Sequence, residues 1–206
     1  MANIGLKIIE SNRQIATLIN KALEKQIDDY IGKRVSNILK EIKLIARQAL
    51  QNSPEILSLQ SGTLKADFGL TSDPTSSIIN SILATLTIDI TKTKTTSRSI
   101  TGGFTVKMQP NDYGNLYFLP SAKQAIKDGY IPWLKWLLEL GDTIIIVNYG
   151  VEYGAFGRTG MAHMTEDTRP FKVNSSYSGT KNNNFITRVF ADSEQEITNA
   201  IIRIMK

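Results

Sequence analysis

The residues whose types could support chemistry are gathered in one short stretch. Arg158 lies within the repeat Gly154-x-x-Gly157-x-x-Gly160, and His163, the only histidine of the chain, follows it. A glycine-rich loop with a basic residue can bind phosphate, but a P-loop requires G-x-x-x-x-G-K-[ST] and a dinucleotide-binding turn requires G-x-G-x-x-G. A zinc or non-haem iron site normally uses two or three His or Cys ligands, and the chain has one histidine and no cysteine. These patterns predict no catalytic, metal or cofactor site.

The same glycines suit a structural turn at a contact between subunits. Glycine adopts positive φ and allows another backbone to approach closely, so the segment must turn sharply or pack tightly. We interpret it as a contact loop; an anion site at Arg158 and an enzyme that uses the Arg158–His163 segment are the alternatives. No G-x-S-x-G elbow is present to position a serine nucleophile. The subunit-contact candidates are Gly154, Phe156, Gly157, Arg158 and Gly160.

The elements expected to position this loop lie directly before it. Pro132 fits the first turn of a helix, Trp133 and Trp136 would lie on the inner face of that helix, and Gly141 would end it. Residues 143–149 (TIIIVNY) form a continuous β-branched run, which is typical of a strand buried on both faces. We therefore expect a rigid core unit that presents the glycine loop.

A long helix is predicted at the N-terminus. From about 11 to 50, apolar residues recur every three to four positions, which is the period of one helix face. Ser11 can act as the N-cap, Gly32 would mark a kink or a break, and Asn52-Ser53-Pro54 would end the helix. A helix of this length spans roughly 60 Å, so we expect it to bend around the core and to pack against another subunit. The apolar positions are Ile15, Ile19, Leu23, Ile27, Ile31, Val35, Ile38, Ile42, Ile45 and Ala49.

A β-hairpin arm is predicted at about 85–108. Apolar residues alternate with polar ones at 86–90 and again at 104–108, as they do in half-buried strands. Between these runs, the polar and basic segment 91–103 ends in two glycines. It is either a disordered loop or an arm that orders against a neighbouring subunit.

Proline, glycine and serine punctuate the rest of the chain. We expect loops at 53–77 and 165–184, one or two helical turns at 76–84, a turn with a short strand (116–119) at 111–120, a short helix at 121–128 and an apolar segment of undefined type at 185–190. Ser193 and Glu196 form a capping-box pattern that would open a C-terminal helix. Together these elements predict an α+β fold, with a long N-terminal helix packed on a small, mostly antiparallel sheet, short helices and a C-terminal helix.

Length and composition fit a single domain over 1–206 with an extended leader at about 1–10. The chain has 206 residues, of which 41% are hydrophobic, enough for one core. No window approaches the roughly 18–20 consecutive apolar residues of a membrane-spanning helix, and the N-terminus lacks the apolar core of a signal peptide. The absence of cysteine excludes disulfides and thiol chemistry and fits a reducing compartment.

Positive charge is concentrated in the first fifty residues. The formal net charge is +5, and residues 1–50 carry nine Lys or Arg against five Asp or Glu. This excess forms either a solvated helix face or a surface toward nucleic acid or an acidic partner. No arginine-rich run or aromatic–basic signature is present, so we expect no base-specific recognition. The DNA-facing candidates are Lys33, Arg34, Lys40 and Lys43.

Three parts of the chain carry a resemblance. Ser61-Gly62-Thr63-Leu64-Lys65 follows the long helix and a proline turn, and PWLKWLLELGDTIIIVNYG precedes the glycine loop. GRTGMAHM, RPFKV and SGTKNNNFITRVF then follow in order. In this order the segments resemble those of the neck and tail-completion proteins of tailed bacteriophages, which form rings between the capsid portal and the tail. The resemblance covers roughly half of the chain, mainly 130–190.

This resemblance implies a non-enzymatic structural protein of the virion, without active site or cofactor, that forms a ring at the head–tail junction through which DNA passes. Copies would pack side by side through the long helix and the glycine loop. Segments 1–10, 91–103 and 165–184 would order against portal, adaptor or tail proteins after assembly in the host cytoplasm. The segment 91–103 departs from the family and leaves the position within the virion open. The alternatives are a small basic DNA-binding protein without sequence specificity and another tail or baseplate component.

Overall fold

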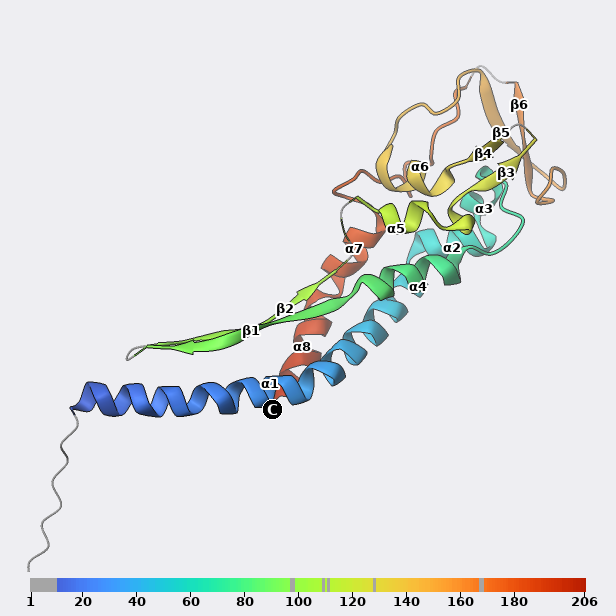
Figure 1. Ribbon diagram of the computed structural model, residues 1–206. Coiled ribbons are helices and arrows are strands. Elements are labelled where there is room, and N and C mark those ends of the chain that lie inside the picture. Colours follow the sequence, from blue (N-terminus) through green and yellow to red (C-terminus); the bar gives the residue numbers. More distant parts are fainter. Residues whose placement is uncertain (1–10, 97–98, 109, 111, 128, 167–168) are drawn as a thin grey trace, which may run out of the picture.

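The computed structural model describes residues 11–206 except 97–98, 109, 111, 128 and 167–168. It shows an elongated molecule with a stalk and a head (Figure 1). The stalk consists of helix α1 (Asn12–Gln51), the hairpin of β1 (Thr87–Thr95) and β2 (Ile100–Lys107), and helix α8 (Glu194–Met205). Helices are interspersed with antiparallel strand pairs along the chain, without parallel β-α-β units in its described part, which confirms the α+β class. The predicted leader at 1–10 lies outside the described residues.

Helix α1 is uninterrupted over 40 residues. The Ser11 hydroxyl accepts a hydrogen bond from the Gln14 N–H at 3.3 Å, and the Gln14 side chain accepts one from the Ser11 N–H at 2.8 Å, so a capping box opens the helix. Gly32 stays helical, so a break does not occur, and the helix bends near its middle (Figure 1). No helix in the described part of the chain is long and apolar enough to cross a membrane.

The head is built from short elements. Its helices are α2 (Pro54–Ser61), α3 (Thr63–Asp67), α4 (Thr75–Thr85), α5 (Gly114–Tyr117), α6 (Trp133–Glu139) and α7 (Phe185–Asp192), with a 3₁₀ turn at Pro120–Ala122. Its strands are β3 (Gln124–Ile126), β4 (Gly129–Ile131), β5 (Tyr149–Tyr153) and β6 (Ala162–Glu166). Within the described ranges the strands form three separate antiparallel pairs, β1–β2, β3–β4 and β5–β6, rather than the one small sheet predicted.

One hydrophobic core joins the C-terminal half of α1 to the head. Ile38 and Ile42 are fully buried. Trp133 is fully buried as well, with its ring centroid 5.5 Å from that of Phe68. Its indole N–H donates to the Ser121 carbonyl at 3.1 Å, which satisfies the polar end of the ring. The predicted core position of Trp133 is confirmed.

Several predictions for the head were wrong because turn residues act as helix caps. Segment 53–77 forms α2, α3 and the start of α4 instead of a loop, since the Ser53 hydroxyl caps α2 and Pro54 occupies its first turn. The strand predicted at 116–119 is the end of α5 and the turn after it, and the described part of the helix predicted at 121–128 is a turn followed by β3. The helical turns predicted within α4 are confirmed.

The apolar run 143–149 does not form the buried central strand predicted for it. Residues 143–146 lie at the edge of the core and bond to Phe171, with the Ile145 N–H donating to the Phe171 carbonyl at 2.8 Å, while 147–148 form a turn and Tyr149 begins β5. Ile144 and Val147 are 52% and 66% exposed. A β-branched run indicates extended backbone, but it does not define which neighbours bury its faces.

The hairpin predicted at about 85–108 is confirmed, and its strands extend further toward the tip than the alternating runs 86–90 and 104–108. Its register runs from Thr87 opposite Lys107 to Thr95 opposite Ile100, with a bulge on the way. Most of the segment 91–103 is therefore paired strand rather than a separate arm, while 97–98 at the tip lie outside the described residues.

The C-terminal helix is confirmed as α8, but the capping box predicted at Ser193 and Glu196 does not form. The Ser193 hydroxyl donates to a carbonyl of the preceding turn at 2.7 Å. A capping box does form one helix earlier, between Asn184 and Thr187. It opens α7, so the apolar segment at 185–190 is helical.

Candidate functional site

The glycine-rich segment connects β5 to β6 through a tight turn. Gly157 (φ +73°) and Gly160 (φ +67°) are left-handed, a conformation that favours glycine. A Cβ at Gly157 would lie 2.0 Å from the Ala162 carbonyl oxygen, so a larger residue would displace backbone. The Gly154 N–H donates to the Met161 carbonyl at 2.9 Å. The predicted sharp turn is confirmed.

Arg158 folds back onto the head. Its Nη1 donates to the Ala125 carbonyl of β3 at 3.1 Å. Its Nε lies against the turn after α3, because a Cβ built on Gly69 would be 2.7 Å from that atom. The guanidinium therefore holds the glycine loop against β3 and the turn after α3, which is a structural role.

Phe156 and His163 pack on each other in the same hairpin. Their ring centroids are 4.3 Å apart in an edge-on arrangement, and His163 Nε2 lies 3.8 Å from Glu152 Oε2. No group of three or more His, Cys, Asp or Glu side chains among the described residues could hold a metal ion. Phe156 is 38% exposed, so it contributes apolar surface to this face of the head.

A partly buried carboxyl also lies in the head, at Asp67, which the sequence did not single out. The Tyr153 hydroxyl donates to Asp67 Oδ1 at 2.5 Å. Burial raises the pKa of Asp67, and burial together with the neighbouring carboxyl raises the pKa of Tyr153. A phenol whose pKa moves further from neutral pH is unsuited to proton transfer there. The pair joins α3 to β5 as a structural contact.

In the stalk, α1 turns a polar face toward its own hairpin. Asp28 Oδ1 accepts hydrogen bonds from the Thr93 N–H at 2.9 Å and the Thr93 hydroxyl at 2.6 Å. Glu24 Oε1 accepts the same two bonds from Thr95 at 2.8 and 2.6 Å, and Asn20 continues the row with a bond to the next carbonyl along. Four residues of helix rise about 6 Å, close to two residues of strand, so the two spacings match.

The opposite face of α1 is apolar and exposed. At about 100° per residue, Leu18, Ile19 and Leu23 point roughly away from the Glu24–Asp28 row. These three side chains, here called the outer stripe, are 61%, 55% and 36% exposed. A helix of a globular protein normally turns its apolar stripe toward the core. Within the described residues, no other part of the chain covers this outer stripe.

The four DNA-facing candidates do not share one surface. Lys40 and Lys43 line a cavity of about 460 Å³ between α1 and α4, together with Arg47, and Lys33 is exposed nearer the N-terminus of the helix. Arg34 faces α8 instead. Its Nε donates to a carbonyl at the end of α8 at 3.0 Å, and its guanidinium lies 3.6 Å from a tyrosine ring centroid. Arg34 is a structural residue at a helix C-terminus.

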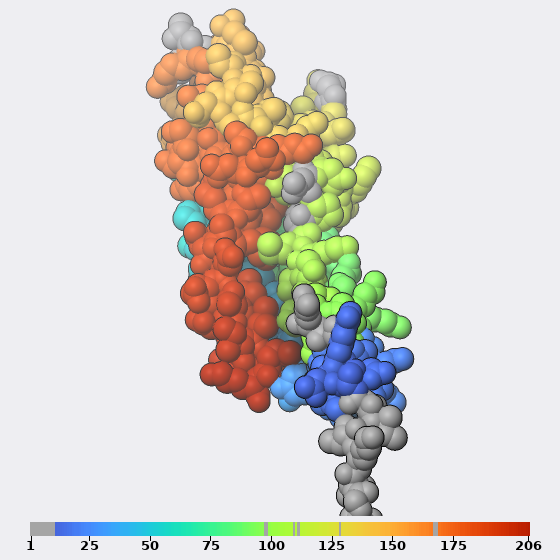
Figure 2. All heavy atoms as spheres, turned by 90° about the vertical axis from the view of Figure 1, so that its left-hand side faces the viewer, coloured from blue at the N-terminus to red at the C-terminus, as the bar shows by residue number. Residues whose placement is uncertain are grey.

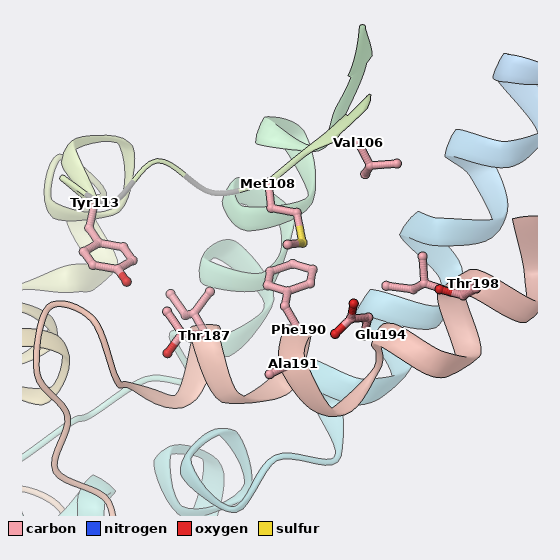
Figure 3. A pocket seen from close by; sticks show the side chains of 10 residues that line it. Val106, Met108, Tyr113, Thr187, Phe190, Ala191, Glu194 and Thr198 are labelled. Carbon is pink, nitrogen blue, oxygen red and sulfur yellow. The ribbon is translucent and has the colours of Figure 1, made fainter. Parts of the chain in front are cut away.

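An apolar groove of about 450 Å³ lies where the end of β2 meets α7 and α8. Met108 and Phe190 point toward one another across it, and Glu194 lies at its edge (Figure 3). Figure 2 shows this side of the molecule, with α7 and α8 in red and the hairpin in green. The sequence did not reveal the groove because its lining comes from two distant segments, 106–113 and 186–198.

Comparisons with known proteins give no information on these sites, because no protein-family model, curated protein or solved structure matches the chain. Function is therefore inferred from the geometry of the chain and from the resemblance of its segments. The surfaces considered for function below are the outer stripe, the apolar groove, the lysines of α1 and the exposed apolar side chains of the head.

Proposed function

We propose that this chain is a non-enzymatic structural subunit that assembles with copies of itself into a ring. The carrying observation is the reversed orientation of α1, which bonds its own hairpin through polar side chains and exposes the outer stripe. Large apolar side chains grouped on an exposed surface mark an interaction site. Ile144 and Val147 in the head offer a second exposed apolar area for lateral contacts.

The resemblance of the segments supports a position at the head–tail junction of a tailed bacteriophage virion. Portal or adaptor proteins and tail proteins would be the neighbours of the ring, and DNA would pass through it. Lys33, Lys40 and Lys43 would face this DNA through phosphate contacts, which need no base recognition. Another tail or baseplate component would use the same assembly chemistry at a different position.

The oligomeric state of the purified chain tests this proposal. Native mass spectrometry across a concentration series is expected to show a discrete oligomer, alone or on addition of virion partners. A strictly monomeric chain under both conditions would rule the proposal out. Antibody labelling of imaged virions then separates the neck, the tail and the baseplate.

A DNA-binding module that acts without assembly is the second candidate, favoured by the convergence of Lys40, Lys43 and Arg47 at one cavity. It predicts salt-dependent DNA binding by the monomer, which the ring proposal does not require.

A further inference from the structure

We infer that the apolar groove between β2 and α7–α8 receives the outer stripe of a second copy of this chain. This contact rests on the proposed function and specifies how the copies join. The two surfaces differ in shape, since the stripe is a convex helix face and the groove is concave. The contact is therefore head-to-tail between copies, and not a symmetric pairing of like surfaces.

The groove has the composition that a helix face requires. Its floor is apolar, with Phe190 and Ile186 almost fully buried and Met108 reaching over them. An amphipathic helix enters such a groove through side chains spaced three and four positions apart. Ile19 and Leu23 have that spacing, and Met108 is an adaptable side chain for receiving them.

The charges beside the two surfaces are complementary. Glu194 lines the groove and is exposed, and Glu196 follows it in the first turn of α8. Lys21 and Lys25 are exposed. At about 100° per residue, Lys25 lies beside Leu18 at the edge of the outer stripe, and Lys21 lies further round the helix toward Asp28. These two glutamates and two lysines form no ion pair within the described part of the chain. Opposite free charges steer the two surfaces together and disfavour like-with-like contacts.

The chain cannot satisfy its own groove. Tyr30 and Arg34 of α1 hydrogen-bond to carbonyls at the C-terminal end of α8, at 2.6 and 3.0 Å. The groove is formed at the opposite, N-terminal end of α8. The path from the outer stripe to the groove runs along α1 from Leu23 to Tyr30 and then along α8 from its C-terminal to its N-terminal end. At 1.5 Å per residue, this path is roughly 20–30 Å long. Because α1 is continuous, the stripe of one copy reaches only the groove of another.

Two single substitutions at exposed positions test the contact without disturbing the core. Ile19→Asp places a charge in the outer stripe, and Ala191→Trp fills the groove from its exposed rim. Leu57→Asp and Asn199→Trp make the same changes at exposed positions outside both surfaces. Native mass spectrometry should show that each test variant loses the oligomer, whereas each control keeps it. Circular dichroism should show that all four stay folded.

Mixing the two test variants distinguishes this contact from any other. The Ile19→Asp chain keeps an open groove and the Ala191→Trp chain keeps an intact stripe, so an equal mixture should form a one-to-one heterodimer that grows no further. If the mixture stays monomeric, or if either variant assembles like the wild type, the inference is wrong even though the wild-type oligomer still supports the proposed function. A wild type that never assembles overturns both.

The absence of native cysteine allows a direct covalent test. The double variant Leu23→Cys/Ala191→Cys, mildly oxidised as the assembled oligomer, should give a ladder of disulfide-linked copies on a non-reducing gel. Each single-cysteine variant can give dimers at most. A double variant that yields no species above the dimer contradicts the stripe-to-groove contact.

Discussion

Asn184 holds three parts of the head together through one fully buried amide. Its Nδ2 donates to the Tyr113 hydroxyl at 2.8 Å and to the Thr180 carbonyl at 3.0 Å. Its Oδ1 accepts from the Ile186 and Thr187 N–H groups at 3.1 and 3.3 Å, which caps α7. A buried cap whose partners have no access to water contributes more than an exposed one.

Replacement of this amide should be costly. We expect Asn184→Ala to lower the free energy of unfolding by about 2–3 kcal/mol, because the cap is removed and buried polar groups are left unsatisfied. Thermal unfolding should move down by about 5–10 °C for a domain of this size. The control is Glu196→Ala, whose capping-box bond does not form, so its stability should change by less than about 0.5 kcal/mol. Equal destabilisation of the two variants would contradict this account.

Residue-level predictions from the sequence succeeded where the cause is local. Positive φ at Gly157 and the cap at Ser11 follow from steric and hydrogen-bonding rules that involve a few neighbouring residues. Ser193 met the same local rule and failed, because its hydroxyl bonds backward to α7. The carbonyl that Arg158 contacts in β3 was not predictable, because the two residues are distant in the sequence.

Among the elements, the hairpin is held to α1 by two carboxylates on successive turns. Asp28 and Glu24 occupy the exposed edge of β1 by bonding the N–H groups of Thr93 and Thr95. An edge strand with free N–H groups is a template for pairing with other chains. The carboxylates thus protect the edge as well as fixing the hairpin to the helix.

Asp28→Ala should release this part of the hairpin. The Thr93 hydroxyl and then the Thr93 N–H lower the pKa of Asp28 below its ordinary 3.8. A lowered pKa contributes stability that is present above the ordinary value and is lost as the pH falls through the folded-state pKa. In the wild type, the hydrogen-exchange protection of the Thr93 amide should therefore hold at pH 5 and decline below about pH 4.

In the Asp28→Ala variant, protection of the Thr93 amide should be reduced at pH 5 and should lose its acid dependence. Asp89→Ala, which removes an exposed carboxylate paired with Lys107 on the same hairpin, should leave that amide unchanged. Unaltered protection of Thr93 in the Asp28 variant would show that the carboxylate does not hold the strand.

Element types were predictable where one face of an element determines its pattern. The period of three to four gave α1 nearly to the residue, and alternation gave the hairpin. The run 143–149 failed because β-branched side chains favour extended backbone whether or not other residues cover their faces. Helix periodicity also could not show that Ile19 and Leu23 face outward. Their orientation depends on the hydrogen bonds from the hairpin to Glu24 and Asp28, which join distant parts of the chain.

At the scale of the whole molecule, the elongated shape arises because only the C-terminal half of α1 packs in the core. Ile38, Ile42 and Ala46 are buried against the head, whereas no residue of α1 before Ile31 is buried, and this half of the helix extends away from the head (Figure 1). A projecting helix can bury an exposed apolar stripe only against another molecule. The groove was not predictable from the sequence, because its lining comes from two distant segments of the chain.

Assembly should turn scattered lysines into a surface for DNA. One chain offers few phosphate contacts, but a ring repeats Lys33, Lys40 and Lys43 in every copy. The wild-type oligomer should bind duplex DNA of any sequence at low salt, and its affinity should fall steeply as salt rises. Changing all three lysines to Gln should reduce the slope of log affinity against log salt by about 0.9 for each phosphate that a lysine no longer neutralises.

Two controls assign the result to the ring. Lys107→Gln removes a lysine that is paired with Asp89 on the hairpin, so it should leave the salt slope unchanged. The Ile19→Asp chain keeps all three lysines but should not assemble, so its DNA affinity should fall well below that of the oligomer. If this monomeric variant binds DNA as tightly as the wild type, the lysines act within one chain. The DNA-binding module would then be the better interpretation of the basic helix, because the DNA affinity would not depend on repeating the three lysines in several copies of the chain.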